Sequence, residues 1–162
     1  MSDLPEQLGV SVIVPARNEE LSLADCLGSL VGQRGPSYEI IVVDDHSTDR
    51  TRRIAEGFPV KVITAGPLPD GWSGKCNACW DGARVAKGKW LLFTDADTRH
   101  NRVSIAQGLL EAEGLDAAML SYSPKQEVHG FAERALMPLI FAELATTYRP
   151  KKVSDPNSPA AR

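Results

Sequence analysis

Three clusters of polar residues interrupt apolar runs in this sequence, and their side chains suit a divalent cation and a phosphorylated ligand. They are PARNEE at residues 15–20, DDHSTD at residues 44–49 and DAD at residues 95–97. Asp95 and Asp97 are separated by one residue, so a turn of the chain would let both carboxylates reach one cation. Mg²⁺ and Mn²⁺ prefer oxygen ligands, and Mg²⁺ commonly takes one or two carboxylates plus phosphate oxygens. The alternative is a polar turn in which an aspartate caps a helix.

The other two clusters suit a nucleoside. Asp44 and Asp45 are adjacent like charges, which are unfavourable unless a cation or hydrogen-bond donors are bound. They could receive the base and ribose of a nucleotide, or Asp45 or Ser47 could simply cap the next helix. Arg17 adds a cationic fork and Glu19 a carboxylate. A surface arginine and a carboxylate that favours a helix start are the alternatives.

The elements predicted around these clusters place all three at one edge of a sheet. Continuous apolar strands are predicted at residues 10–14, 39–43, 60–64, 89–94 and 117–122. They alternate with predicted helices at residues 21–30, 75–86 and 103–113, and with a short helix that ends at residue 55. This alternation predicts an α/β fold with a mostly parallel sheet covered on both faces. The predicted buried faces of the first and last helices are Leu21, Ala24, Leu27 and Leu30, and Val103, Ala106, Leu109 and Leu110. In such sheets ligands bind outside the carboxyl ends of the strands.

The strings VSVIVPARNEE, EIIVVDDHSTDRT and KWLLFTDAD, in this order and spacing, resemble the family 2 glycosyltransferases of the GT-A fold. The resemblance implies a three-layer α/β/α sandwich whose Rossmann-like half binds a nucleotide-sugar. It also implies an inverting transfer of the sugar to an acceptor hydroxyl, with a lipid-linked acceptor as one option. The third string carries the DxD motif, so the resemblance assigns Mg²⁺ or Mn²⁺ to Asp95 and Asp97. The wording GWSGK at residues 71–75 is closest to the hopene-associated and ceramide glucosyltransferase-like branches.

The same resemblance implies a set of binding residues. Lys75 would contact the nucleotide or its diphosphate, since the helix dipole disfavours a lysine that merely begins a helix. Asn77 would line the same wall, and the glycines at 71, 74, 82 and 88 suit close backbone approaches. UDP is favoured over GDP by the family. The predicted nucleotide-sugar site is Pro15, Ala16, Arg17, Glu19, Asp44, Asp45, Lys75, Asp95, Ala96 and Asp97.

No catalytic base is assigned from the sequence. Members of the family supply it from an aspartate downstream of the DxD motif and often carry QxxRW further on, and neither string is found here. We therefore expect a truncated chain with a tail at residues 1–9, a nucleotide-sugar-binding domain at 10–125, and an amphipathic helix with the start of an acceptor-side region at 126–162. A non-catalytic nucleotide-binding fragment stays open. A sugar nucleotidyltransferase is disfavoured, because PARNEE lacks the glycines of a phosphate loop.

Net charge, hydropathy and cysteine content limit the classes of partner and the location that can be expected. The net charge of −3 and the lack of a basic stripe argue against a nucleic-acid partner. No window offers roughly 20 uninterrupted apolar residues, and no signal peptide is evident. Residues 131–148 form an apolar stripe that suits a membrane surface, a further domain or an ordinary core. Three cysteines without an export signal predict reduced thiols and a cytoplasmic protein, and the full-length protein is expected at the cytoplasmic face of a membrane with peripheral contact. A redox or zinc role of Cys76 and Cys79 is disfavoured, which predicts ordinary buried thiols.

Overall fold

The computed structural model describes residues 9–123, 125, 130, 136–138 and 142–143 of the chain. The chain divides into two units, Met1–Tyr122 and Ser123–Arg162, and the fold described here is that of the first unit. Residues 1–8 of the predicted tail and most of the amphipathic stripe at residues 131–148 lie outside the described residues. In the described part of the chain, no helix is long and apolar enough to cross a bilayer.

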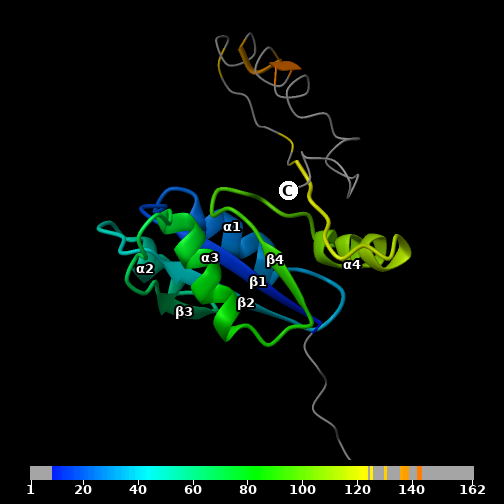
Figure 1. Ribbon diagram of the computed structural model, residues 1–162, viewed down its shortest axis with the longest axis horizontal. Helices are drawn as coiled ribbons and strands as arrows, with labels where there is room; N and C mark the ends of the chain where they lie inside the picture. The colour runs from blue at the N-terminus through cyan, green and yellow to red at the C-terminus, as the bar shows by residue number, and fades with distance from the viewer. Residues whose placement is uncertain (1–8, 124, 126–129, 131–135, 139–141, 144–162) are drawn as a thin grey trace, which may run out of the picture. The chain divides into compact units, whose positions relative to one another are not determined.

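A four-stranded parallel sheet forms the centre of the first unit, with the strands in the order β3-β2-β1-β4 (Figure 1). Strand β1 therefore pairs with β2 on one side and with β4 on the other. Strands β2 and β3 are added on one side of β1, and β4 is added on the other. Open α/β sheets bind ligands at such a point, where the order of the strands reverses. The elements are β1 (Val10–Ala16), α1 (Leu23–Val31), β2 (Tyr38–Asp44), α2 (Thr51–Ala55), β3 (Lys61–Thr64), α3 (Gly74–Val85), β4 (Trp90–Phe93) and α4 (Ser104–Gly114).

Helices cover both faces of this sheet, as the alternation of elements predicts. Because successive strand residues point to opposite faces, β1 feeds two separate cores. Val12 and Val14 pack with residues of α1, α2 and α4. Ile13 packs on the other face with Ala78 of α3 and with Val43 of β2. The predicted three-layer α/β/α arrangement with a parallel sheet is confirmed.

The predicted buried faces of two helices are wrong in detail. Leu21 is 91% exposed and Ala24 is exposed, whereas Leu23, Cys26, Leu27 and Leu30 form the buried face of α1. A spacing of three falls about 60° short of a full helical turn, so such a row drifts around the helix, while the spacing 23, 26, 27, 30 stays on one side. In α4 the buried residues are Ile105 and Ala112, and Val103 and Leu110 are exposed.

The strand predicted at residues 117–122 is absent, and this stretch is irregular. Met119 is 81% exposed and Tyr122 is 59% exposed. An apolar run becomes a strand only when a neighbour satisfies its backbone hydrogen bonds. Strand β4 has β1 on one side and no strand on its other side among the described residues, and nothing in the local sequence reports that.

Two glycines allow α3 and the segment that follows it to lie close to the sheet. A Cβ on Gly82 would lie 2.5 Å from Cγ2 of Ile13 and 3.1 Å from Cγ2 of Val43, so only glycine lets the helix lie this close to the sheet. A Cβ on Gly88 would collide with the backbone of Val10 and Ser11. The hydroxyl of Ser73 accepts the amide of Cys76 at 3.2 Å and begins the helix. The first turn of α3 is thereby held beside the carboxyl ends of the strands.

Candidate functional site

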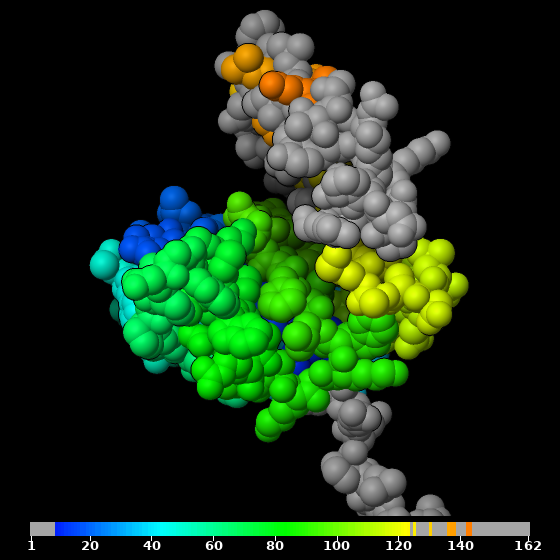
Figure 2. All heavy atoms as spheres, in the orientation of Figure 1, coloured from blue at the N-terminus to red at the C-terminus, as the bar shows by residue number. Residues whose placement is uncertain are grey.

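The three polar clusters lie together at the edge of the sheet formed by the carboxyl ends of its strands, here called the carboxyl edge. All four strands are parallel, and the register pairs Ala16 with Asp44 and Ile13 with Phe93, so the segments after β1, β2 and β4 leave the sheet on the same side. In Figure 2 the blue and cyan loops that follow β1 and β2 lie beside green atoms of the α3 region. An arrangement with Asp44 and Asp95 on opposite edges is excluded.

Asp45 joins the segment after β1 to the start of α3. Its Oδ2 lies 3.3 Å from Nη1 of Arg17, and its amide donates to the carbonyl of Ala16 at 2.9 Å. A Cβ on Gly74 would collide with the same Oδ2, so the first turn of α3 rests directly on this carboxylate. The Asp45 side chain is 12% exposed and that of Arg17 is 66% exposed, which leaves the guanidinium open to a ligand.

Asp44 serves its own loop instead. Its side chain is 6% exposed, Oδ1 accepts the amide of Ser47 at 3.1 Å, and Oδ2 lies 3.8 Å from Nη1 of Arg52. The α2 helix is started by Asp49, whose Oδ1 accepts the amide of Thr51 at 2.9 Å. The two adjacent aspartates therefore have different roles: Asp44 stabilises the turn after β2, and Asp45 contacts the start of α3.

The loops after β1 and β2 are tied together by hydrogen bonds that the sequence does not reveal. The amide of Asn18 donates to Oγ of Ser47 at 3.1 Å, and its Oδ1 accepts the amide of Thr48 at 2.9 Å. Asn18 has a positive φ of 56°, which asparagine tolerates better than most residues. That tolerance is the one local signal that could have marked Asn18 as important to the site.

Glu19, Pro15 and Ala16 support the site rather than face it. The carboxylate of Glu19 accepts the hydroxyl of Ser22 at 2.6 Å, next to the start of α1, and the amide of Glu19 donates to Thr51. Pro15 is half-buried within β1, and Ala16 is buried in the core below it. Their contribution to ligand binding would have to come through the backbone.

The DxD motif forms a turn at residues 95–98, here called the DxD turn. The amide of Thr98 donates to the carbonyl of Asp95 at 3.2 Å. Ala96 is 3% exposed and belongs to the core, whereas Asp95 and Asp97 on either side of it are exposed. The buried alanine therefore anchors a turn that presents two carboxylates to solvent.

Lys75 connects this turn to α3. Its Nζ lies 2.5 Å from Oδ1 of Asp95, with side chains 62% and 56% exposed. The hydrogen bond to Asp95 is the main reason why the pKa of Lys75 is raised above its ordinary value. Lys75 stands in the first turn of α3, where the helix dipole disfavours a cation. The carboxylate offsets that cost and places a positive charge at the carboxyl edge.

Helix α1 contacts the DxD turn and the residues after it, and no local sequence pattern predicts these contacts. The thiol of Cys26 donates to the carbonyl of Asp95 at 3.6 Å, and the amide of His100 donates to Oγ of Ser29 at 3.0 Å. Arg99 forms an ion pair with Asp25. Burial, reinforced by the charges of nearby acids including Asp97 and Asp95, raises the pKa of the Cys26 thiol to about 12.

The donor set fits a divalent cation that takes its remaining ligands from a bound molecule. Among the described residues, no group of three or more His, Cys, Asp or Glu side chains is placed to hold a metal ion. Mg²⁺ usually keeps several waters and binds through one or two carboxylates plus phosphate oxygens. Two exposed carboxylates on one turn, Asp95 and Asp97, match that requirement.

The other residues of the GWSGK segment and its helix are mainly structural. Asn77, predicted to line the site, is 4% exposed and donates Nδ2 to the carbonyl of Gly66 at 3.0 Å. Asp81 accepts the amide of the same Gly66 at 2.7 Å, so α3 holds the loop after β3 at both backbone groups. Gly71 needs its positive φ of 80° rather than close packing. Cys76 is exposed and Cys79 is partly buried, so the prediction of buried thiols fails for Cys76.

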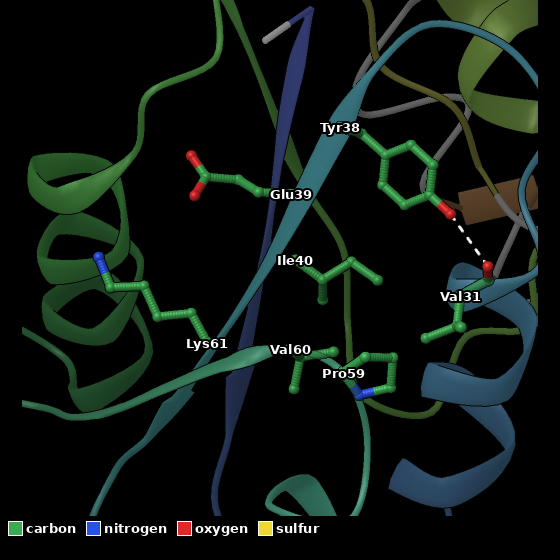
Figure 3. A pocket seen from close by; sticks show the side chains of 7 residues that line it. All are labelled: Val31, Tyr38, Glu39, Ile40, Pro59, Val60 and Lys61. Atoms are coloured by element: carbon green, nitrogen blue, oxygen red, sulfur yellow. Dashed lines mark hydrogen bonds between the residues drawn. The ribbon is translucent and has the colours of Figure 1, made fainter.

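A hollow of about 340 Å³ lies at the opposite, amino-terminal end of the sheet (Figure 3). It is formed by the starts of β2 and β3 and the end of α1, where the hydroxyl of Tyr38 donates to the carbonyl of Val31 at 3.0 Å. Its lining residues are Val31, Tyr38, Glu39, Ile40, Pro59, Val60 and Lys61. None of the predicted site residues contributes to it, so this hollow is separate from the carboxyl edge.

Comparison with known proteins shows the family to which the chain belongs. Residues 11–159 match the model of the family described as glycosyl transferase family 2. The chain is 33% identical over 127 residues to 4,4'-diaponeurosporenoate glycosyltransferase from Staphylococcus aureus, which covers 76% of this chain and 34% of that protein. The chain thus spans about a third of the length of the curated relatives it matches.

Solved structures of similar fold include complexes with UDP and with a UDP-sugar. TarS from S. aureus in complex with UDP has a TM-score of 0.57 and 26% identity, covering 76% of this chain and 38% of that one. TarS in complex with UDP-GlcNAc has a TM-score of 0.55 at the same identity, covering 76% and 37%. Mannosyl-3-phosphoglycerate synthase from Rubrobacter xylanophilus has a TM-score of 0.52 and 29% identity, covering 85% and 49%. The predicted GT-A fold is confirmed, and with the family match over residues 11–159 the chain belongs to glycosyl transferase family 2.

Proposed function

We propose that this region binds a nucleoside diphosphate sugar at the carboxyl edge and supplies the donor side of an inverting glycosyltransferase. The observation that carries the proposal is the convergence of Asp45, Lys75 and the DxD turn from three separate segments. The TarS complexes, at 26% identity, support UDP as the nucleotide.

The charges at the site suit the reaction. An acceptor oxygen would form a bond to the anomeric carbon while the bond from that carbon to the diphosphate breaks, so negative charge grows on the leaving diphosphate. Lys75 is cationic and exposed at this edge, where it can stabilise that charge. A divalent cation on Asp95 and Asp97 would supply further Lewis-acid stabilisation. Asp45, backed by Arg17, would hold the nucleoside.

The acceptor side of the proposal rests on the sequence resemblance. On that basis, the acceptor carries a hydroxyl group and can be lipid-linked. The full-length protein would lie at the cytoplasmic face of a membrane. Among the residues that the structure describes, none is assigned as the base that removes the acceptor proton. We therefore assign donor binding, and not complete catalysis, to the described residues.

Calorimetric titration of UDP with and without Mn²⁺ tests the proposal. Wild type should bind UDP more tightly with Mn²⁺, and Asp97→Asn should reduce that metal-dependent affinity by at least about tenfold. Asp116→Asn is the matched control, because Asp116 is an exposed aspartate that follows α4 and its positive φ of 48° suits asparagine. UDP affinity that is unchanged by Mn²⁺ or by Asp97→Asn would remove the proposed site.

Two assays separate the alternatives. Slow release of sugar from a UDP-sugar, without any acceptor, is expected of a donor site with access to water. Nucleotide binding without this hydrolysis would favour a non-catalytic binding region. Formation of pyrophosphate from UTP and a sugar 1-phosphate would favour a nucleotidyltransferase instead.

A further inference from the structure

Lys75 contacts the carboxylate that the proposed function gives to a metal ion. Nζ of Lys75 and Oδ1 of Asp95 are 2.5 Å apart, which is a charge-assisted hydrogen bond and not a distant attraction. Asp97, the other aspartate of the DxD turn, forms no hydrogen bond or ion pair within the part of the chain that the structure describes. One of the two proposed metal ligands is therefore already paired with a cation and the other is not.

An ammonium and a divalent cation would compete for the same oxygen. Two positive charges a few ångströms apart repel each other, and the repulsion is stronger near a protein surface than in bulk water. The DxD turn contributes two negative charges, and Lys75 offsets one of them. Since no third acidic or histidine ligand is grouped with them among the described residues, this offset removes a large share of the attraction for a metal.

The backbone around Lys75 is held in place, so only its side chain is free to move. Ser73 caps the helix start through the amide of Cys76, and Gly74 lies against the carboxylate of Asp45. The Lys75 side chain itself is 62% exposed and can rotate without disturbing the core. A diphosphate that accompanies the metal would offer it new anionic oxygens on the same side of the sheet.

We propose that Lys75 is an internal counter-ion that pairs with Asp95 until a divalent cation and a nucleoside diphosphate bind together. This inference rests on the proposed function, because it assigns the metal to the DxD turn and the diphosphate to the carboxyl edge. Lys75 then exchanges Asp95 for a phosphate oxygen. The exchange makes binding of metal and nucleotide mutually dependent, since neither alone both releases the lysine and gives it a new partner.

Electron paramagnetic resonance of Mn²⁺ measures the metal step without nucleotide, because the signal of free Mn²⁺ is lost when the ion binds. Wild type should bind Mn²⁺ alone weakly. Lys75→Met should bind it at least about tenfold more tightly, because a competing charge is gone. Lys75→Arg should remain as weak as wild type, since it keeps the positive charge. Lys87→Met is the matched control, an exposed lysine beyond the end of α3 that should change nothing.

A second measurement guards against a change in folding or an unrelated Mn²⁺ site. The double variant Lys75→Met with Asp95→Asn should lose the gained affinity, and circular dichroism should show that all variants keep the wild-type helix content. UDP should raise the Mn²⁺ affinity of wild type by a larger factor than that of Lys75→Met. If Lys75→Met binds Mn²⁺ alone no better than wild type, Lys75 is only a surface partner or a phosphate contact, and the inference is overturned.

The inference and the proposed function fail in different ways. Tighter Mn²⁺ binding by Lys75→Met, together with no UDP binding by any variant, would keep the counter-ion and reject the nucleotide site. Metal-dependent UDP binding that is lost in Asp97→Asn, together with equal Mn²⁺ affinity of Lys75→Met and wild type, would keep the nucleotide site and reject the counter-ion.

Discussion

The buried thiol of Cys26 in α1 donates a hydrogen bond to the backbone carbonyl of Asp95, at a sulfur–oxygen distance of 3.6 Å. Sixty-nine positions separate the two residues, yet this contact joins the hydrophobic core to the turn that carries both proposed metal ligands. Cys26 is 1% exposed and packs in the same core as Ala96. The position of the DxD turn therefore depends on how α1 packs.

Replacing Cys26 by alanine should destabilise the protein and loosen the DxD turn. The change leaves a small cavity and removes the donor to Asp95, so we expect a loss of about 1–3 kcal/mol in the free energy of unfolding. Urea denaturation measures this loss, and calorimetry should show weaker Mn²⁺-dependent UDP binding. Cys76→Ala is the control, because Cys76 is exposed. Equal stability of Cys26→Ala and Cys76→Ala would contradict the role of the thiol.

Replacing Gly74 by alanine should impair the site more than the fold. The added Cβ would collide with Oδ2 of Asp45, so the start of α3 and the Asp45 carboxylate must move apart. We expect metal-dependent UDP affinity to fall by at least about tenfold, as measured by calorimetry. Gly28→Ala in α1 is the comparison, since its Cβ would meet nothing within 4 Å and helical alanine is favoured by about 0.5–1 kcal/mol. Wild-type UDP affinity of Gly74→Ala would show that this contact is unimportant.

Gly82→Ala should destabilise the packing of α3 on the sheet. Its Cβ would lie 2.5 Å from Cγ2 of Ile13. This methyl group is close to the backbone, so it cannot move aside as the end of a long, flexible side chain could. Overpacking of this kind costs about 1–3 kcal/mol in the free energy of unfolding. Gly114→Ala, at the end of α4 with nothing within 4 Å of the new Cβ, should cost much less. Chemical denaturation of the two variants side by side decides the matter.

Protonation of His100 should destabilise the protein at low pH. Burial lowers the pKa of His100 below its ordinary value of 6.5, and its Nε2 lies 2.9 Å from Oγ1 of Thr94, just before the DxD turn. The unfolded chain therefore takes up this proton first as the pH falls below about 6.5, and stability is lost from there down to the lower pKa of the folded state. Below both values the loss is complete.

Thermal melts between pH 7.5 and 5 measure this effect. The His100→Gln variant should lose less stability over this interval than wild type, because it has no proton to take up at that position. An NMR titration of the His100 ring in wild type should give a midpoint below 6.5. A wild-type midpoint above that value, or identical pH slopes for the two proteins, would contradict the prediction.

The three-layer fold could be predicted from the sequence because its signals are local. Runs such as VSVIV and EIIVV are buried on both faces, and each leads directly into a polar cluster. Parallel strands then bring those clusters to one edge without any further information. Residues 117–122 show where this reasoning fails. An apolar run forms a strand only if another strand lies beside it, and the local sequence does not show which strands will be neighbours.

The sequence by itself determined which residues reach the carboxyl edge. The end of each strand, and the resemblance of the three strings to a known family, can be recognised within short stretches of the chain. The tertiary structure decided what each of them does there. It turned Asp44 toward Ser47 and set Asp45 against Gly74, and it brought Lys75 onto Asp95. Such pairings depend on the rotation of each helix about its axis and on the order of the strands. Both are set by packing among distant segments, because the buried area and hydrogen bonds of the whole unit, and not of any local stretch, select them.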